Sequence, residues 1–509
     1  MLNLTGKAES YWVATLVGEI PDYPSLDSDL AVDVAIIGGG IVGLTAAELL
    51  TRAGKRVAVV EARKLGQQVT GRSTAKVTSQ HGLIYQRLFK EFGEETARVY
   101  GAANQAALEQ IARHVRDGEI DCEFERTAAY VYASSAAQLA EIEKEVEIAK
   151  KLGLPATFVR DVPLPFTTAG AIRFDDQAQF NPLKYCLGLA KAVAGIGGLV
   201  FEGTRARSFE HGKPCKVTTE RGTVMARDVI DAGHMPLGKE GMFFAKAYPY
   251  AHAVVAAKID PAQAPQGMFI SAASPTRSVR AARRNGEAYL IATGGAYKPG
   301  DPERAIDALD DLRRFVQDEF GVQSIDYYWT NQDYEPMDGM PFIGRASSGA
   351  EHLFVATGFN AWGITTGTAA GMILADLIMD RTNSWAAAVD ATRVKPVKAA
   401  PSFVRENVST GVHLVGGYLA SRPNTIDDLA PGEAAVLNMD GESVAVFKDD
   451  HSELHAVSAV CTHLSCTLGW NPADRTWDCS CHGSRFAVDG SVLHGPATAP
   501  LEPKSVSRA

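Results

Sequence analysis

Four residues near the C-terminus have the types and spacing of metal ligands: Cys461, His463, Cys479 and His482. One residue separates the first cysteine from its histidine, two separate the second pair, and fifteen lie between the two halves. Each half offers one thiolate and one imidazole on a short segment, and both zinc and iron accept these donors. Because Cys466 and Cys481 lie in the same stretch, a module held by two disulfides is an alternative.

The surrounding sequence favours an iron–sulfur centre over zinc. A zinc finger usually places its histidines on a helix, whereas this region is rich in Gly and Pro and has the pattern of short strands. The arrangement C-x-H-x15-C-x-x-H is typical of a Rieske [2Fe–2S] centre, in which two histidines replace two cysteines on one iron. The strings CTHLSC and CSCHGS resemble those of the cytochrome bc-type Rieske proteins. The string GPA at 495–497 resembles their proline loop, which covers the cluster.

This resemblance implies that the four residues bind the cluster and that a disulfide joins Cys466 to Cys481. It also implies that the exposed imidazole edges of His463 and His482 are the exit for electrons. Zinc binding and a plain disulfide module remain the alternatives.

Ser484 and Phe486, which follow the second histidine, affect the reduction potential that we expect for the cluster. Neutral imidazoles leave less negative charge on the iron than thiolates do, so the cluster is easier to reduce. Ser484 can donate a hydrogen bond to a cluster sulfur, which favours reduction further. In bc-type proteins a tyrosine two positions later donates a second bond. That position is Phe486 here, so we expect a lower potential.

The N-terminal part begins with the pattern of a βαβ unit. The β-branched run 32–37 predicts a buried parallel strand, and residues 41–53 carry apolar side chains at helical spacing. A second strand is predicted at 56–60. Further helices are expected at 102–115 and 136–151, interleaved with several short strands.

A glycine loop joins the first strand to the first helix. Gly38 would permit the tight turn, Gly40 would let the main chain approach a pyrophosphate, and Gly43 would let the helix pack closely on the strand. Glu61 ends the second strand and is placed to accept hydrogen bonds from a ribose. Dinucleotide binding is therefore predicted.

Two later segments favour FAD as the dinucleotide. Gly71–Gly82 is a polar loop of small residues, and Asp338–Ile378 reads as a strand, a glycine turn and a helix that begins near Gly363. The N-terminus of that helix could stabilise negative charge on a reduced flavin. Over residues 30–385 the chain resembles the flavoprotein amine and amino-acid oxidoreductases, a superfamily that includes glycine oxidase, sarcosine oxidase and D-amino acid oxidase.

Pattern and resemblance together give the expected FAD-binding residues: Gly38, Gly39, Gly40, Gly43, Glu61, Ala62, Arg63, Ser73, Thr74, Ala75, Ala206, Gly358, Gly363, Ile364 and Thr365. Some members of the superfamily attach FAD covalently through a histidine or cysteine. The string STAKV stands where the histidine would fall, and no cysteine lies near YEPMDGMPFIG, so non-covalent FAD is expected. A second glycine fingerprint for a nicotinamide is absent from the sequence, because AGIGGLV at 194–200 follows a helix and not a strand.

The sequence does not identify a catalytic residue. His81 and His234 lie in segments that could approach the flavin, although a structural role is the simpler reading of each. His252, Arg277 and Arg280 fall in the presumed substrate region, where an arginine could clamp a carboxylate.

Composition limits the classes of protein. Of the 509 residues 46% are apolar and 22% charged, which argues against disorder. A net charge of −10 disfavours nucleic-acid binding. No run of 18 apolar residues predicts a membrane span, and no secretory signal is visible, so a cytoplasmic protein is expected.

The expected fold class is α/β, with a Rossmann-like FAD-binding domain, an inserted antiparallel-sheet substrate domain and a C-terminal all-β Rieske domain. The FAD-dependent region is expected at 1–385, with FAD-binding segments at about 30–90, 155–240 and 330–385 and substrate-domain segments at about 91–154 and 241–329. A linker is expected at 386–405 and the Rieske domain at 406–509.

The whole chain resembles bacterial fusions of an amine-oxidase-like FAD domain to a Rieske domain. This implies that an amine or amino-acid-like substrate gives a hydride to FAD, and that the [2Fe–2S] cluster passes single electrons to a partner protein. One alternative reverses the flow, so that the cluster reduces FAD for a reduction or monooxygenation. Another is a redox sensor or electron-transfer module without turnover.

Overall fold

The predicted βαβ unit forms the centre of an eight-stranded sheet in the computed structural model, which describes residues 4–506 except 17, 19 and 394–424. Its main path runs β17-β18-β11-β2-β3-β8, and a β9–β10 hairpin extends β11. The strands are β2 (Leu30–Ile37), β3 (Val57–Val60), β8 (Leu199–Phe201), β9 (Ser208–Glu210), β10 (Cys215–Thr218), β11 (Thr223–Asp231), β17 (Phe342–Arg345) and β18 (Leu353–Thr357). Four of these strands pair in parallel around β2, which is the arrangement expected of a dinucleotide-binding sheet.

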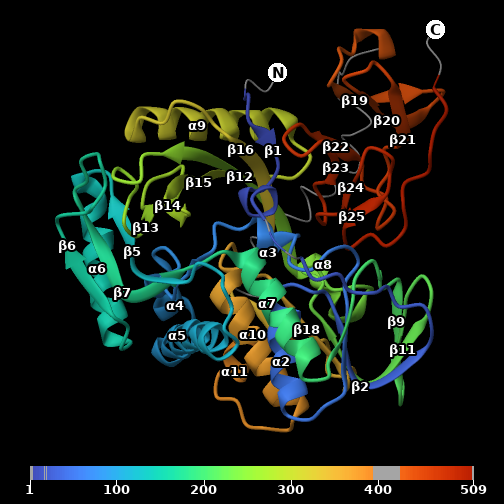
Figure 1. Ribbon diagram of the computed structural model, residues 1–509, viewed down its shortest axis with the longest axis horizontal. Helices are drawn as coiled ribbons and strands as arrows, with labels where there is room; N and C mark the ends of the chain where they lie inside the picture. The colour runs from blue at the N-terminus through green and yellow to red at the C-terminus, as the bar shows by residue number, and fades with distance from the viewer. Residues whose placement is uncertain (1–3, 17, 19, 394–424, 507–509) are drawn as a thin grey trace.

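Long helices cover this sheet (Figure 1). They are α2 (Ile41–Arg52), α7 (Pro182–Gly195) and α10 (Gly363–Ile378), and α5 (Glu94–Asp117) packs against α10. The start of α7 follows from its sequence, because the Asn181 side chain accepts the Lys184 N–H and Pro182 occupies the first turn. Helix α5 is longer than the predicted 102–115, since its early turns also bury apolar residues.

A ten-stranded, mostly antiparallel sheet forms the second layer. Its path is β1-β16-β12-β15-β14-β13-β5-β7-β4, and β6 pairs with β7. The strands are β1 (Lys7–Ala8), β4 (Lys76–Val77), β5 (Glu125–Ala133), β6 (Ala156–Val159), β7 (Gly170–Gln179), β12 (Ala247–Ile259), β13 (Met268–Ser271), β14 (Arg277–Arg284), β15 (Glu287–Tyr297) and β16 (Tyr327–Pro336). Helix α9 (Pro302–Phe320) covers one face, and its apolar residues join the core under β12 and β15.

The remaining helices are α1 (Tyr11–Ala14), α3 (Val69–Arg72), α4 (Ile84–Phe92), α6 (Leu139–Lys151), α8 (Phe243–Lys246) and α11 (Ala386–Val389), and of these α1, α3 and α8 each lie between a strand of one sheet and a strand of the other. Strands β6 and β7 belong to the ten-stranded sheet, so the structure places 156–179 with the substrate layer and not with the expected FAD-binding segment. Most of the expected linker, from residue 394, and the expected start of the last domain at 406 lie outside the described residues.

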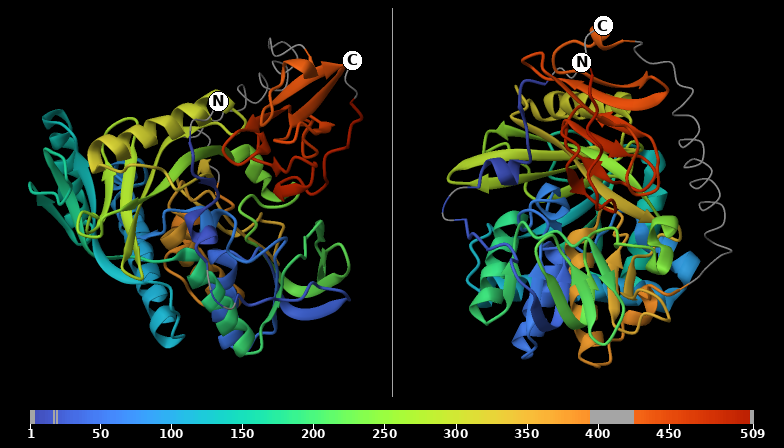
Figure 2. Two further views of the ribbon diagram at one scale, coloured as in Figure 1. Left: turned by 45° about the horizontal axis from the view of Figure 1, so that its top comes forward. Right: turned by 90° about the vertical axis from the view of Figure 1, so that its right-hand side faces the viewer.

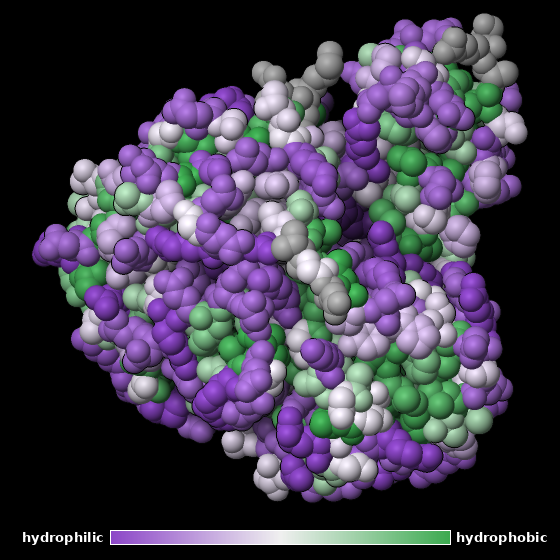
Figure 3. Space-filling model, viewed as in Figure 1, coloured by the Kyte–Doolittle hydropathy of each residue, from purple (hydrophilic) through white to green (hydrophobic). Residues whose placement is uncertain are grey.

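The C-terminal part forms two small antiparallel sheets. One contains β19 (Ala434–Met439), β20 (Glu442–Lys448) and β21 (Leu454–Ser458), and the other β22 (Leu468–Asn471), β23 (Thr476–Cys479), β24 (Arg485–Phe486) and β25 (Val492–His494). Figure 2 shows this domain beside β16 and α8. In Figure 3 it projects at the upper right and meets the rest of the molecule along its lower side. No described helix has the length and apolar character that a membrane span requires.

Candidate functional site

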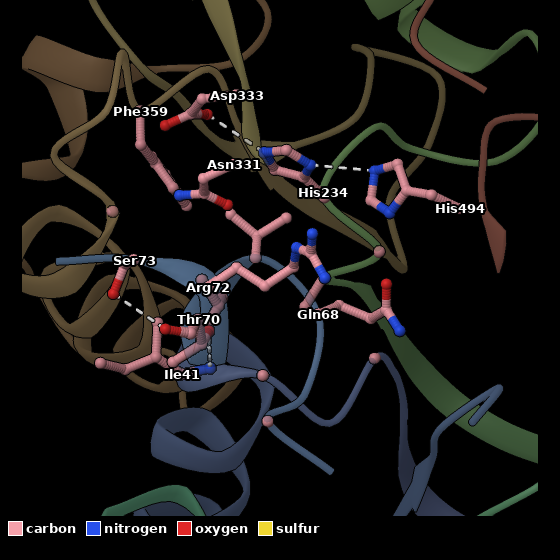
Figure 4. A pocket seen from close by; sticks show the side chains of 18 of the residues that line it. Ile41, Gln68, Thr70, Arg72, Ser73, His234, Asn331, Asp333, Phe359 and His494 are labelled. Atoms are coloured by element: carbon pink, nitrogen blue, oxygen red, sulfur yellow. Dashed lines mark hydrogen bonds and ion pairs between the residues drawn. The ribbon is translucent and has the colours of Figure 1, made fainter. Parts of the chain in front are cut away.

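A cavity of about 320 Å³ is lined by the glycine loop, the loop after α3, one face of the ten-stranded sheet and the C-terminal domain (Figure 4). Eleven of the expected FAD-binding residues line it: Gly38, Gly40, Glu61, Ala62, Ser73, Thr74, Ala75, Ala206, Gly363, Ile364 and Thr365. Gly39, Gly43, Arg63 and Gly358 do not. The contacts of all these residues with FAD stay a prediction.

The glycine loop leaves room for a ligand on one side only. Gly38 has φ +103°, a conformation that favours glycine. A Cβ on Gly43 would lie 2.0 Å from the Gly38 carbonyl oxygen, so the helix packs against the turn. A Cβ on Gly40 would meet only the Thr70 hydroxyl at 3.3 Å, and the loop is therefore open toward the cavity at that position.

Glu61 is held in place by the loop that it faces. Its two carboxylate oxygens each accept a main-chain N–H at 2.9 Å, one from Gly39 and one from Arg63. Burial raises its pKa, although these two bonds oppose the shift. Each oxygen keeps a lone pair, so the carboxylate can still accept hydroxyl donors from a ribose.

The end of α3 and the loop after it are fixed from outside by four side chains that donate to four consecutive carbonyl oxygens. The bonds run from Ser10 to Gly71 (2.6 Å), from Trp329 to Arg72 (2.7 Å), from Trp12 to Ser73 (2.8 Å) and from Arg280 to Thr74 (2.6 Å). Ala75 follows with φ +57°. Because these carbonyls point away from the cavity, the other edge of the loop is presented to a ligand. Sequence reasoning missed Ser10 and Trp12, which no local pattern connects to this loop.

Arg277 and Arg280 do not form the carboxylate clamp that the sequence left open. Arg277 forms a two-point ion pair with Asp311 on α9, and the Arg280 guanidinium donates hydrogen bonds to the carbonyl oxygens of Thr74 and Phe180. Neither guanidinium is therefore free to bind a substrate carboxylate. Both arginines lie in β14, within the presumed substrate region, but their partners come from distant segments.

Lys76 is the cation that the sequence analysis overlooked. It lines the cavity, is 8% exposed, and donates to the Thr74 hydroxyl at 3.1 Å. Among the described residues no carboxylate forms an ion pair with it, and burial lowers its pKa to about 7. A buried ammonium of this kind can hold a negatively charged group.

The two histidines whose segments could approach the flavin, His81 and His234, have different roles. His234 lines the cavity with φ +75°, on a loop that Asp231 fixes by accepting the N–H groups of Gly233 and Leu237. His81 does not line it. His81 stacks on Trp362 at 4.5 Å, and burial lowers its pKa to about 3, so it is a neutral structural residue.

The C-terminal loops bring the four predicted ligands together. The thiols of Cys461 and Cys479 are free and buried, and the imidazole centroids of His463 and His482 are 5.0 Å apart. Both Nδ1 atoms are buried without a hydrogen-bond partner among the described residues, as expected of atoms that bind a metal. The donor set therefore fits a [2Fe–2S] cluster. Cys466 and Cys481 form a disulfide between the two loops.

The expectation that the histidine edges are an exposed exit is wrong for His482. Its side chain is only 8% exposed, and Phe244 of α8 packs edge-on against both imidazoles, at 5.5 and 5.6 Å. The resemblance could not reveal this, because α8 belongs to the other part of the chain. The two histidines that are predicted as ligands therefore face the N-terminal part.

Ser484 and Phe486 lie where the sequence places them. The Ser484 hydroxyl accepts the Ala497 N–H at 3.0 Å. Phe486 is fully buried in the same small core as Cys461 and Cys479.

An ionic network crosses the contact between the two parts. Arg72, on the loop that lines the cavity, pairs with Asp474 at 2.5 Å, and Asp474 pairs with Arg485 at 2.6 Å. Arg485 reaches Asp478, next to Cys479, at 3.0 Å. The same side chains thus connect the cavity loop to a ligand loop.

Comparison with known proteins agrees with both cofactors. Residues 33–377 match the family described as FAD dependent oxidoreductase, and residues 424–504 match the Rieske [2Fe-2S] domain. The Rieske 2Fe-2S iron-sulfur protein YhfW of Bacillus subtilis is 35% identical over 496 residues, 97% of each chain. Gamma-glutamylputrescine oxidoreductase of Escherichia coli is 26% identical over 392 residues, 74% of this chain and 90% of that one. The structure of glycine oxidase from Geobacillus kaustophilus aligns with a TM-score of 0.58 at 19% identity, covering 72% of this chain and all of that one.

Proposed function

The chain belongs to the family of FAD-dependent oxidoreductases and carries a C-terminal Rieske [2Fe–2S] domain, and from this premise we propose that it oxidises an amine or amino-acid-like substrate. In this proposal the electrons then pass singly through the cluster to an external acceptor. When bound, FAD takes a hydride from a substrate C–H bond, and a Rieske cluster carries one electron at a time. The remaining argument concerns what this chain's own residues do.

The proposal depends mainly on the position of strand β16 between the cavity and the C-terminal domain. Asn331 and Asp333 line the cavity, whereas the residues between and after them face the C-terminal domain. Gln332 donates to the Gly483 carbonyl at 2.8 Å and Tyr334 to the His482 carbonyl at 2.9 Å. Since side chains alternate along a strand, one strand forms a wall of both sites. This closeness supports electron transfer within the chain.

The residues around the cavity support oxidation of an amine. Lys76 and the neutral His252, whose pKa burial lowers to about 4, line the cavity beside Asn331. His252 lies directly opposite Asn331 in the register of β12 and β16, so both side chains lie on the same face of the sheet. A neutral imidazole can accept a hydrogen bond from a substrate amine. The E. coli relative acts on an amine by its name, which adds support.

The proposal is tested by anaerobic mixing of the oxidised holoenzyme with a panel of primary amines, secondary amines and amino acids. Flavin bleaching is followed optically and the reduced cluster by low-temperature electron paramagnetic resonance. Bleaching of the flavin followed by the cluster signal is the expected result. If no compound bleaches the flavin but a reduced ferredoxin fills first the cluster and then the flavin, the flow is reversed and the proposal is wrong.

A further inference from the structure

The C-terminal domain supplies part of the wall of the cavity. Five of its residues line the space that also contains most of the expected FAD-binding residues: Leu493, His494, Gly495, Ala497 and Thr498. They come from the end of β25 and the segment after it. Without this segment the cavity has no wall on that side.

Hydrogen bonds attach this segment to residues of the N-terminal part. His494 Nε2 lies 3.0 Å from His234 Nδ1, and Arg205 donates to the Val492 carbonyl at 2.8 Å. His234 and Arg205 themselves line the cavity. The other ring nitrogen of His234 lies 3.1 Å from Asp333, so His234 stands between a residue of β16 and a residue of the C-terminal domain (Figure 4).

The same segment also contacts the cluster site. Three residues after His494, the N–H of Ala497 donates to the Ser484 hydroxyl. Ser484 follows the predicted ligand His482 by two positions, and its carbonyl accepts the N–H of Cys479 at 2.8 Å. A displacement of this short segment would therefore change the geometry of both the cavity and the cluster site.

We propose that the Rieske domain is a structural part of the FAD-binding site, that His494 is the residue that positions the shared wall, and that FAD and the cluster each stabilise the site of the other. The coupling is reciprocal, because a ligand that tightens one side of a shared wall must itself bind more tightly when the other side is in place. This inference does not depend on the substrate or on the direction of electron flow.

The first experiment measures the dissociation constant of FAD by fluorescence titration of flavin-free protein that retains its cluster. His494→Ala should weaken FAD binding about ten-fold, which corresponds to the loss of one hydrogen bond and its packing. His494→Gln, which keeps a hydrogen-bonding group, should recover most of the affinity. His455→Ala is the matched control, because His455 lies in the same domain and pairs with Asp449 away from the cavity.

A double-mutant cycle with His234→Ala tests the contact itself. If the two histidines act together, the double variant should lose little more FAD affinity than either single variant does. An FAD affinity of His494→Ala within two-fold of the unaltered protein, with a normal cluster spectrum, would overturn the proposal.

The reciprocal experiment needs no variant and so does not depend on how the variants fold. The cluster of the unaltered protein is extracted with bipyridyl, with and without saturating FAD, and bleaching of the cluster absorption is timed. FAD should slow extraction several-fold. Equal rates in the two samples would show that the sites are independent.

Discussion

The hydroxyl of Tyr334 donates a 2.9 Å hydrogen bond to the main-chain carbonyl of His482. The Tyr334 side chain is fully buried, and its ring meets that of His234 with centroids 4.6 Å apart. One aromatic side chain thus touches a residue of the cavity and a residue of the cluster loop.

Tyr334→Phe keeps the ring and removes the donor. Because the His482 carbonyl then loses its partner at a buried contact, we expect the free energy of unfolding to fall by about 1 kcal/mol. We also expect the cluster to be reduced several-fold more slowly after photoreduction of the flavin, measured by flash photolysis. Tyr185→Phe is the control, since that buried hydroxyl bonds to His114 instead. Equal transfer rates in the two variants would contradict the role of Tyr334.

Asp474 should make the contact between the two parts sensitive to acid. Burial alone would raise its pKa, but Arg72 and Arg485 outweigh burial and hold the pKa well below its usual range. A depressed pKa means that the stabilisation is present above the unfolded value, near 4, and is lost as the pH falls below it. Asp474→Asn should cost about 3 kcal/mol at pH 7 and flatten this acid slope, measured by calorimetry from about pH 2 to 7. Asp450→Asn, which removes an exposed ion pair, should change neither quantity.

Two glycine variants separate ligand binding from folding. Gly40→Ala should fold normally and weaken FAD binding, because φ is −92° and the new Cβ would meet only the Thr70 hydroxyl, at 3.3 Å, on the side of the cavity. Gly43→Ala should lower the free energy of unfolding by about 2 kcal/mol or more, because its Cβ would clash with the Gly38 carbonyl. Thermal melting of both proteins and FAD titration of Gly40→Ala provide the test. An unchanged FAD affinity for Gly40→Ala would contradict the predicted pyrophosphate site.

Lys76→Met tests whether the substrate carries an acid group. If the ammonium holds a carboxylate, KM for amino acids should rise about ten-fold and KM for simple amines should stay within two-fold. Since the pKa of Lys76 is about 7, binding of amino acids by the unaltered protein should weaken as the pH rises through 7. Lys191→Met, an exposed position on α7, is the control. Equal effects on both substrate classes would exclude a carboxylate contact.

Phe486→Tyr should raise the reduction potential of the cluster. The position lies in the small core around the ligand cysteines, so a hydroxyl there would add a hydrogen-bond donor close to the cluster. The measurement is a redox titration followed by electron paramagnetic resonance. Phe447→Tyr, in the same core but stacked on Trp470, should leave the potential unchanged. An unchanged reduction potential in Phe486→Tyr would contradict this prediction.

Local spacing explains what could be predicted from the sequence. The strand, glycine turn and helix from Leu30 to Arg52 form where the pattern places them, because each is specified by neighbouring residues. The same holds for the loops that bring Cys461 and Cys479 together, whose ligand spacing is short.

Long-range pairing explains what could not be predicted. Ser10 and Trp12 reach a loop about 60 residues away, and His494 reaches His234 across 260 residues. The covered position of His482 depends on Phe244, which no ligand motif includes. Such contacts depend on how sheets and domains pack together, and no short sequence window contains that information.

The alternation of side chains along β16 also restricts insertions and deletions in this strand. Deletion or insertion of one residue within Tyr327–Pro336 would exchange the two faces of the strand beyond that point. Gln332 and Tyr334 would then turn toward the cavity, while Asn331 and Asp333 would turn toward the ligand loops. Substitutions in this strand can affect one site at a time, but a change in its length would disable both together, so we expect its length to be kept among relatives that retain both domains.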